Sequence, residues 1–148
     1  MYDTILVPFD GSEEAMEGAT HGVELAAATG SRVLGLYVMD LPGAPRALSL
    51  RDAEEELREE YREFGEEVLA ELGEVAADHG AEYITAIRTG SVSQEIIDCA
   101  DETGAVDLIV MGTAYQGRLG SLLGGTATKV VNHATVPVLT RRMQFDEV

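Results

Sequence analysis

The sequence predicts an α/β domain built on one parallel β-sheet with helices covering both faces. Short runs rich in Ile, Val, Leu and Thr alternate with longer stretches in which apolar residues recur every three or four positions. Several short runs are apolar at nearly every position, which is typical of strands buried on both faces. The chain has 148 residues and no Pro/Gly/Ser-rich linker, so we expect a single domain spanning residues 1–148.

Five segments have the composition of strands. They are Thr4–Phe9, Arg32–Val38, Tyr83–Arg88, Leu108–Met111 and Pro137–Thr140. A helical pattern separates each strand from the next, so the predicted order is βαβαβαβαβ. Parallel strands joined by right-handed helical crossovers form an open, doubly wound sheet in three layers.

The first predicted helix follows Ser12, a good N-cap, and has Glu13 and Glu14 in its first turn, where the helix dipole favours negative charge. It is expected to end at Gly30, because glycine readily adopts the left-handed conformation found after helices. Its inward face consists of small residues, which allows close packing on the sheet: Ala15, Ala19, Val23 and Ala26.

The second predicted helix is long, from about Asp52 to Asp78, and Gly80 follows it. One face is mostly Glu and Arg, and the other is an apolar stripe typical of a helix packed on a core. The stripe consists of Leu57, Tyr61, Phe64, Val68, Leu72 and Val75.

Two shorter helices complete the pattern. The third opens at Ser91 with the sequence of a capping box and carries Ile96 and Ile97 before Gly104. The fourth is predicted from about Gly125 to His133, with Val130 and Val131 directed inward. Both helices would pack against the sheet through these apolar residues.

Acidic residues dominate the composition, with 27 Asp and Glu against 10 Lys and Arg and a net charge of −17. Such a surface repels phosphate backbones and anionic lipids, so neither nucleic acid nor a membrane is an expected partner. The acids are spread along the chain, which favours adaptation to a high-salt cytoplasm over an acidic interaction tail. A cytoplasmic location is expected, because no signal peptide and no membrane-spanning run is present.

Potential metal and disulfide chemistry is limited. Cys99 is the only cysteine, which excludes an internal disulfide, and its neighbours indicate a buried position. The three histidines lie on different predicted helices without the spacing of metal ligands, so no metal site is expected.

Three segments are expected to meet at the carboxyl ends of the strands, where open α/β sheets bind ligands. The first is Pro8-Phe9-Asp10-Gly11 after the first strand, and the second contains Val38 at the end of the second strand. Asp10 could face a ligand, or it could cap the first helix together with Ser12.

The third segment follows the fourth strand and opens the last helix. It has five glycines in the 14 residues from Gly112 to Gly125, followed by Thr126. Glycine allows backbone N–H groups to approach a phosphate, and a helix N-terminus favours its negative charge. The segment is neither a P-loop nor a dinucleotide-binding fingerprint, because the required spacings are missing. A plain flexible turn is the alternative.

Taken together, these segments resemble the universal stress protein family over essentially the whole chain. The resemblance rests on Ile5–Ser12, Leu36–Asp40, Asp107–Thr113, Leu122–Thr126 and Val136–Leu139. It implies a Rossmann-like, adenine nucleotide α-hydrolase-like sheet of five parallel strands in the order 3-2-1-4-5. It also implies a homodimer paired through the last strand, near Val136–Arg141, where an unpaired edge offers a template for a partner.

Family members that bind ATP carry the motif Gly-x2-Gly-x9-Gly-Ser/Thr, and this chain departs from it. If Gly112 is the first glycine, Tyr115 stands at the second position and Gly125-Thr126 at the end. If Leu122-Leu123-Gly124-Gly125 is aligned with the family's Leu-Leu-Gly-Ser instead, Gly117 or no residue supplies the second glycine. The nucleotide-binding residues implied by the resemblance are Pro8, Phe9, Asp10, Val38, Gly112, Thr113, Tyr115, Gly117, Gly124, Gly125 and Thr126.

The expected function is therefore that of a regulatory dimer in the stress response that binds ATP or AMP, with or without Mg²⁺, and acts on an unidentified protein partner. One alternative is a nucleotide-free dimeric interaction module, with residues 40–50 and the acidic long helix as contact surfaces. A weak ATPase is a further alternative. No catalytic residue and no dedicated enzyme are expected, since no second acid is present in the glycine-rich segment.

Overall fold

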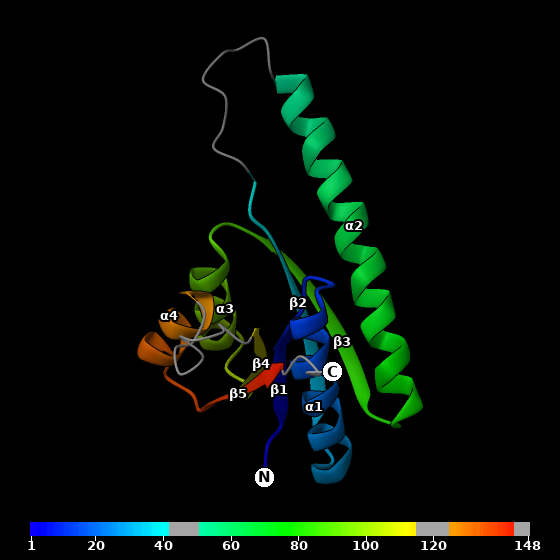
Figure 1. Cartoon of the computed structure of the whole chain (residues 1–148), viewed down its shortest axis with the longest axis vertical. Coiled ribbons are helices and arrows are strands. Elements are labelled where there is room, and N and C mark those ends of the chain that lie inside the picture. Colours follow the sequence, from blue (N-terminus) through cyan, green and yellow to red (C-terminus); the bar gives the residue numbers. More distant parts are fainter. Residues whose placement is uncertain (42–50, 115–124, 144–148) are drawn as a thin grey trace, which may run out of the picture.

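The computed structural model describes residues 1–41, 51–114 and 125–143. Five parallel strands form one sheet in the order β3-β2-β1-β4-β5 (Figure 1), which confirms the predicted fold. The strands are β1 (Thr4–Pro8), β2 (Arg32–Met39), β3 (Glu82–Thr89), β4 (Val106–Ala114) and β5 (Val138–Met143). The helices are α1 (Glu13–Thr29), α2 (Arg51–Asp78), α3 (Val92–Thr103) and α4 (Gly125–His133).

Helices cover the sheet on both faces, so the domain has two apolar cores. On one face α1 and α2 bury residues such as Val23 and Leu72 against β1 and β2. On the other face α3 and α4 bury Ile96 and Val130 against β1, β2 and β4. Cys99 belongs to this second core and is buried, as the sequence predicted.

Close backbone contact between α1 and β4 depends on two glycines. A Cβ atom at Gly112 would lie 1.7 Å from the carbonyl oxygen of Glu14, and one at Gly18 would lie 2.2 Å from the amide nitrogen of Gly112. Real Cβ atoms never approach other atoms so closely, so a side chain at either position would push the helix away from the strand. The close approach of α1 to β4 therefore explains why small residues were found on the inner face of α1.

Glycines also allow α2 to pack closely on two tyrosines of the sheet. Gly65 lies over the ring of Tyr37, and Gly73 lies over the ring of Tyr83. The Tyr83 hydroxyl donates a hydrogen bond to the carbonyl oxygen of Leu69, with 2.7 Å between the oxygens. Burial raises the pKa of Tyr83, so this donor keeps its proton at all physiological pH values.

The predicted helix ends were mostly confirmed. Ser12 caps α1, because its hydroxyl accepts a hydrogen bond from the amide of Ala15 at 3.2 Å, and Gly30 follows in the left-handed conformation. Ser91 is the N-cap residue of α3, but its side chain makes no capping hydrogen bond, so the predicted capping box was wrong in this respect. The first turn of α3 is instead fixed by an ion pair from β3, described below.

Two inward-facing predictions were also wrong. Val131 is 43% exposed although Val130 beside it is fully buried, because successive residues of a helix point about 100° apart and Val131 falls on the outer side of α4. Phe64 is 47% exposed although it continues the stripe of α2, because its ring meets Tyr37 at the edge of the core while Tyr61 and Val68 on either side of it pack inward. None of the described helices is long and apolar enough to span a membrane.

Candidate functional site

A cavity of about 310 Å³ lies at the carboxyl ends of β1, β2 and β4. Its volume is at the lower end of the range for small-molecule sites, about 300 to 1,000 Å³. The described residues that line it come from three strands and from the N-terminal turns of three helices. They are Pro8, Phe9, Asp10, Ser12, Glu14, Ala15, Leu36, Val38, Val92, Ile96, Met111, Gly112, Thr113, Ala114, Gly125, Thr126 and Ala127.

The structure brings together the segments that the sequence singled out. Eight of the eleven predicted nucleotide-binding residues line this cavity: Pro8, Phe9, Asp10, Val38, Gly112, Thr113, Gly125 and Thr126. The other three, Tyr115, Gly117 and Gly124, lie outside the described residues. The choice between the two alignments of the glycine-rich segment falls on those residues, and contact of any of the eleven with a ligand stays a prediction.

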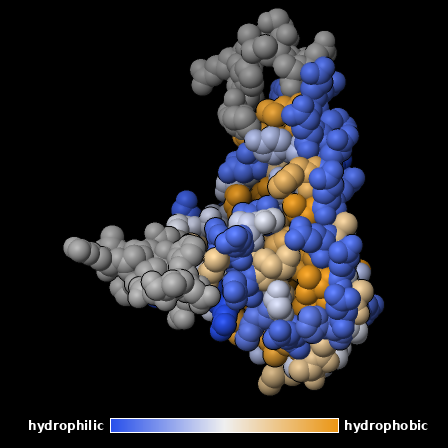
Figure 2. Space-filling view, turned by 45° about the vertical axis from the view of Figure 1, so that its right-hand side comes forward, coloured by the Kyte–Doolittle hydropathy of each residue, from blue (hydrophilic) through white to orange (hydrophobic). Residues whose placement is uncertain are grey.

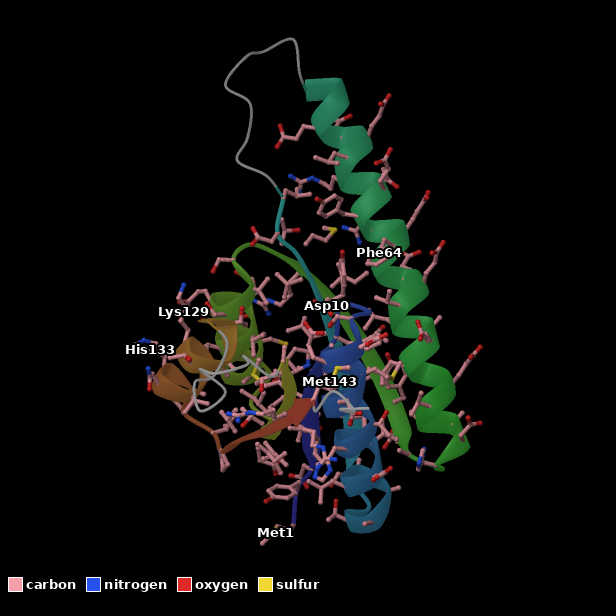
Figure 3. All side chains as sticks on the ribbon, viewed as in Figure 1. Met1, Asp10, Phe64, Lys129, His133 and Met143 are labelled. Atoms are coloured by element: carbon pink, nitrogen blue, oxygen red, sulfur yellow. The ribbon has the colours of Figure 1, made fainter. Side chains whose placement is uncertain are left out.

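Asp10 combines the two roles that the sequence left open. Its Oδ1 atom accepts a hydrogen bond from the amide of Ser12 at 2.9 Å, which fixes the turn between β1 and α1. The same side chain is exposed and lines the cavity. Figure 3 shows Asp10 at the upper end of β1. A carboxylate held by its own turn is well placed to accept a hydrogen bond from a ligand.

One wall of the cavity is apolar and is supplied by β2 and α3, on one face of the sheet. Val38, Val92 and Ile96 belong to the core between α3 and the sheet and also line the cavity. Val92 and Ile96 were missed as site residues by the sequence analysis. The signal was available, since α3 follows β3 and its first turns must therefore lie at the carboxyl edge where the ligand was expected.

The opposite side of the cavity is polar. The buried Thr113 is the second-last residue of β4, and Gly125 and Thr126 begin the first turn of α4, where backbone N–H groups are available to an anion. A Cβ atom at Gly125 would meet nothing within 4 Å, so open space adjoins this helix end. The described residues lining the cavity include no Lys, Arg or His, and Arg118 lies outside the described residues.

The α3 wall is held by Arg88 of β3. Its Nε atom lies 2.9 Å from Oε1 of Glu95, and its Nη2 atom lies 2.8 Å from Oε2 of Glu102. The two carboxylates raise the pKa of Arg88, so the guanidinium is always charged. Because Glu95 lies in the first turn of α3, this ion pair fixes the turn that carries Val92 and Ile96 toward the cavity.

The electrostatics of the neighbourhood are acidic. Asp10 and Glu14 both line the cavity. Burial, followed by the charges of Tyr61 and Asp10, raises the pKa of Tyr37 on the other side of the sheet. Within the described ranges no group of three or more His, Cys, Asp or Glu side chains is arranged to hold a metal ion. An apolar wall facing a helix N-terminus suits a ligand with a flat apolar part and an anionic part.

The chain is similar to known proteins over nearly its whole length. The model of the universal stress protein family matches residues 1–142. A curated relative, Universal stress protein MJ0531 from Methanocaldococcus jannaschii, is 34% identical over 143 residues, covering 94% of this chain and 81% of the relative. The solved structure of universal stress protein UspA from Lactobacillus plantarum has a TM-score of 0.80 at 26% identity and covers 94% of this chain and 97% of its own.

Two further solved structures are complexes with adenine nucleotides. One is a universal stress protein in complex with cAMP, with a TM-score of 0.70 at 22% identity, covering 95% of this chain and 97% of its own. The other is the universal stress protein from Archaeoglobus fulgidus in complex with dAMP, with a TM-score of 0.64 at 22% identity and the same coverage. At these identities they establish likeness of fold.

Proposed function

Because the chain belongs to the universal stress protein family, we propose that it is a regulatory protein of the stress response that binds ATP or AMP in the cavity at the carboxyl edge of its sheet. The observation that carries this proposal is the cavity itself, which joins the apolar wall of Val38, Val92 and Ile96 to the N-terminus of α4. An adenine ring suits the apolar wall, and a phosphate suits the helix N-terminus.

Three further observations support the adenine nucleotide. The predicted residues that the structure describes all line one cavity, although they come from four different segments of the chain. Asp10 is held by Ser12 at the edge of the site, where it can accept a hydrogen bond from an exocyclic amino group. Two solved proteins of the same fold are complexes with cAMP and dAMP, which share the adenine base.

The proposal is tested by calorimetric titration of the full chain with adenosine, AMP, ATP and GMP, each with and without Mg²⁺, in molar KCl. We expect AMP and ATP to bind and GMP to bind at least about tenfold more weakly, because the 6-oxo group of guanine repels an acceptor such as the Asp10 carboxylate. Absence of binding heat for every nucleotide, or equal affinities for AMP and GMP, would contradict an adenine site. The four ligands also show whether the phosphates or Mg²⁺ add affinity.

We also propose that the protein forms a homodimer through β5, the edge strand after β4. The amide of Ile109 donates to the carbonyl of Pro137 at 3.0 Å, and in a parallel pair alternate residues bond to the same neighbour. Pro137, Leu139 and Arg141 therefore face β4. Val138, Thr140 and Arg142 turn their N–H and C=O groups outward, where a second copy could pair with them.

Replacing Thr140 with proline is expected to convert the dimer to a monomer, because proline removes an outward N–H group without touching the ladder to β4. The control is Thr140→Val, which keeps the N–H group and the shape. Sedimentation equilibrium compares the two variants with the unaltered chain. A Thr140→Pro protein that remains as dimeric as Thr140→Val would place the interface elsewhere, and an unaltered chain that is monomeric would reject the dimer altogether.

We propose that this protein acts by binding and is not a dedicated enzyme. Hydrolysis of ATP requires a base, a metal-binding acid and a positive group that converge on the phosphates. Asp10 and Glu14, the acids among the described lining residues, both come from the β1–α1 side of the cavity. If the calorimetry shows that nucleotide is hydrolysed, a weak ATPase is favoured. If no nucleotide binds, a nucleotide-free interaction module is favoured. The cytoplasmic location stays a prediction.

The net charge of −17 leads us to propose adaptation to high salt. Repulsion among unpaired acids is screened within about 3 Å at 1 M salt but only within about 10 Å at 0.1 M. Salt also weakens surface ion pairs such as Arg58–Glu54, but such pairs contribute at most about 1 kcal/mol each. The free energy of unfolding, measured with urea, is therefore expected to rise from 0.1 M to molar KCl, and a fall would reject salt adaptation.

A further inference from the structure

The apolar stripe of α2 continues past the sheet that it covers. With 28 residues α2 is about 42 Å long, whereas the eight residues of β3 extend about 26 Å. Contact with the core begins at Tyr61 and continues through Gly65, which lies over Tyr37, to the buried Leu69 and Leu72. In Figure 1 the N-terminal half of α2 extends beyond the carboxyl ends of the strands.

Three side chains continue the stripe on this overhanging half. We call Leu57, Tyr61 and Phe64 the distal stripe. Leu72 is fully buried and Val68 is 6% exposed, whereas Leu57 and Tyr61 are half-buried and Phe64 is 47% exposed, so the described residues cover the distal stripe only in part. The rings of Phe64 and Tyr37 meet edge to face, with 5.9 Å between centroids, and 47% of Phe64 stays exposed.

The distal stripe is bordered by acidic residues. The segment from Glu54 to Glu67 contains eight glutamates and two arginines, a net charge of −6. One of the arginines, Arg58, lies 3.9 Å from Glu54. Figure 2 shows apolar residues along the inner side of this helix and hydrophilic residues along its outer side. An apolar strip of three helical positions between acidic borders matches an amphipathic helix with a basic polar face.

We propose that the distal stripe is a docking surface for a basic amphipathic helix of another protein. A second copy of this chain is disfavoured as the occupant, because two segments of charge −6 would face each other. The surface is separate from the nucleotide cavity, since Phe64 and Tyr37 lie on the α1–α2 face of the sheet and Val38 and Ile96 on the α3–α4 face. The inference therefore stands whether or not nucleotide binds.

The surface nevertheless borders the β1–α1 turn that the cavity uses. A Cβ atom at Gly11 would lie 3.7 Å from Cζ of Phe64, and the preceding residue, Asp10, lines the cavity. Figure 3 shows Asp10 and Phe64 at the same end of the domain. A partner helix on the distal stripe would thus lie against a turn whose other side faces the ligand.

The test uses the full chain and a synthetic peptide of about five helical turns, with leucine at the positions of one helix face and lysine elsewhere. A scrambled peptide of identical composition measures attraction by charge alone. Fluorescence anisotropy at low salt is expected to give at least tenfold tighter binding of the amphipathic peptide. Phe64→Ser should weaken that binding at least tenfold and bring it close to that of the scrambled peptide.

Ile84→Ser is the matched control, because Ile84 of β3 is similarly exposed at 40% but lies outside the distal stripe. It should leave peptide affinity unchanged. Equal binding of the two peptides, or equal effects of the two substitutions, would overturn the proposal. Self-association of the unaltered chain that Phe64→Ser abolishes and Ile84→Ser does not would also overturn it, in favour of a second copy as the occupant.

Discussion

Replacing Gly112 with alanine is expected to destabilise the domain by about 3 kcal/mol or more, at the upper end of the cost of overpacking a core. The new Cβ atom would lie 1.7 Å from the carbonyl oxygen of Glu14, which belongs to the helix backbone and cannot rotate aside. To make room, α1 would have to move away from β4 and open the core around Val23. A typical domain has only about 5 to 15 kcal/mol of stability, so much of it would be lost.

The matched control for this prediction is Gly125→Ala. Gly125 is the first residue of α4 and has open space around its Cα atom. Its replacement by alanine is expected to change the free energy of unfolding by less than about 0.5 kcal/mol, since alanine also favours the helix. Urea unfolding followed by circular dichroism in molar KCl measures both variants. A Gly112→Ala protein as stable as Gly125→Ala would show that α1 does not pack on β4 as described.

This result bears on how the glycine-rich segment is interpreted. The sequence suggested that Gly112 allows a phosphate to approach the backbone, whereas the structure gives it a packing role against Glu14 and Gly18. Loss of nucleotide binding in a Gly112 variant would therefore not distinguish a missing ligand contact from a misplaced helix. Variants that leave the fold intact are needed for the binding site.

Val38→Glu is expected to abolish binding of adenosine, AMP and ATP alike, lowering affinity about 100-fold or more. Val38 lines the cavity and is only partly buried, so a longer polar side chain can reach solvent in the free protein. With the base bound, the carboxylate would be desolvated without a partner, which costs about 3 kcal/mol or more. Calorimetric titration of each ligand, with urea unfolding as a check on stability, measures the effect.

Two further variants separate the base from the phosphate. Val38→Thr keeps the shape of the side chain and adds only a neutral hydroxyl, which costs far less to desolvate than a carboxylate, so it should weaken affinity much less than Val38→Glu. Gly125→Val places a branched side chain at the first turn of α4 and should weaken AMP while sparing adenosine. If Val38→Glu bound AMP as well as Val38→Thr, the apolar wall would not be the base site.

Most of the fold could be predicted from the sequence because each element carries a local signal. The apolar run before Pro8, the cap at Ser12 and the glycine at Gly30 placed β1 and α1 to within a residue. β4 was predicted too short at both ends, because Asp107 interrupts the apolar run at its start and two of the three residues in Gly112-Thr113-Ala114, glycine and alanine, are depleted in strands. Pairing of this stretch with Arg141, Arg142 and Met143 of β5 makes it a strand, and a local pattern does not contain that information.

In the site and on the exposed surface, too, some features could be predicted from the sequence and others could not. The three segments at the carboxyl edge could be predicted because a parallel sheet gathers them there. Val92 and Ile96 were missed because the capping-box pattern at Ser91 was interpreted only as the start of a helix, although this helix begins at the same edge. The exposure of Phe64 could not be predicted, since the periodicity of α2 is uniform and does not distinguish Phe64 from Tyr61 and Val68, which pack against the core. Only the placement of α2 on β2 and β3 sets this difference.

The most direct test of the central claim is an amide NMR spectrum of the ¹⁵N-labelled full chain during titration with AMP. We predict that shifts concentrate at the residues around the cavity, in particular Asp10, Val38, Val92, Thr113 and Thr126, and that the lower half of α2 near Leu72 stays unchanged. Shifts that are absent at saturating AMP, or that centre on α2 instead of the cavity, would contradict an adenine nucleotide site at the carboxyl edge of the sheet.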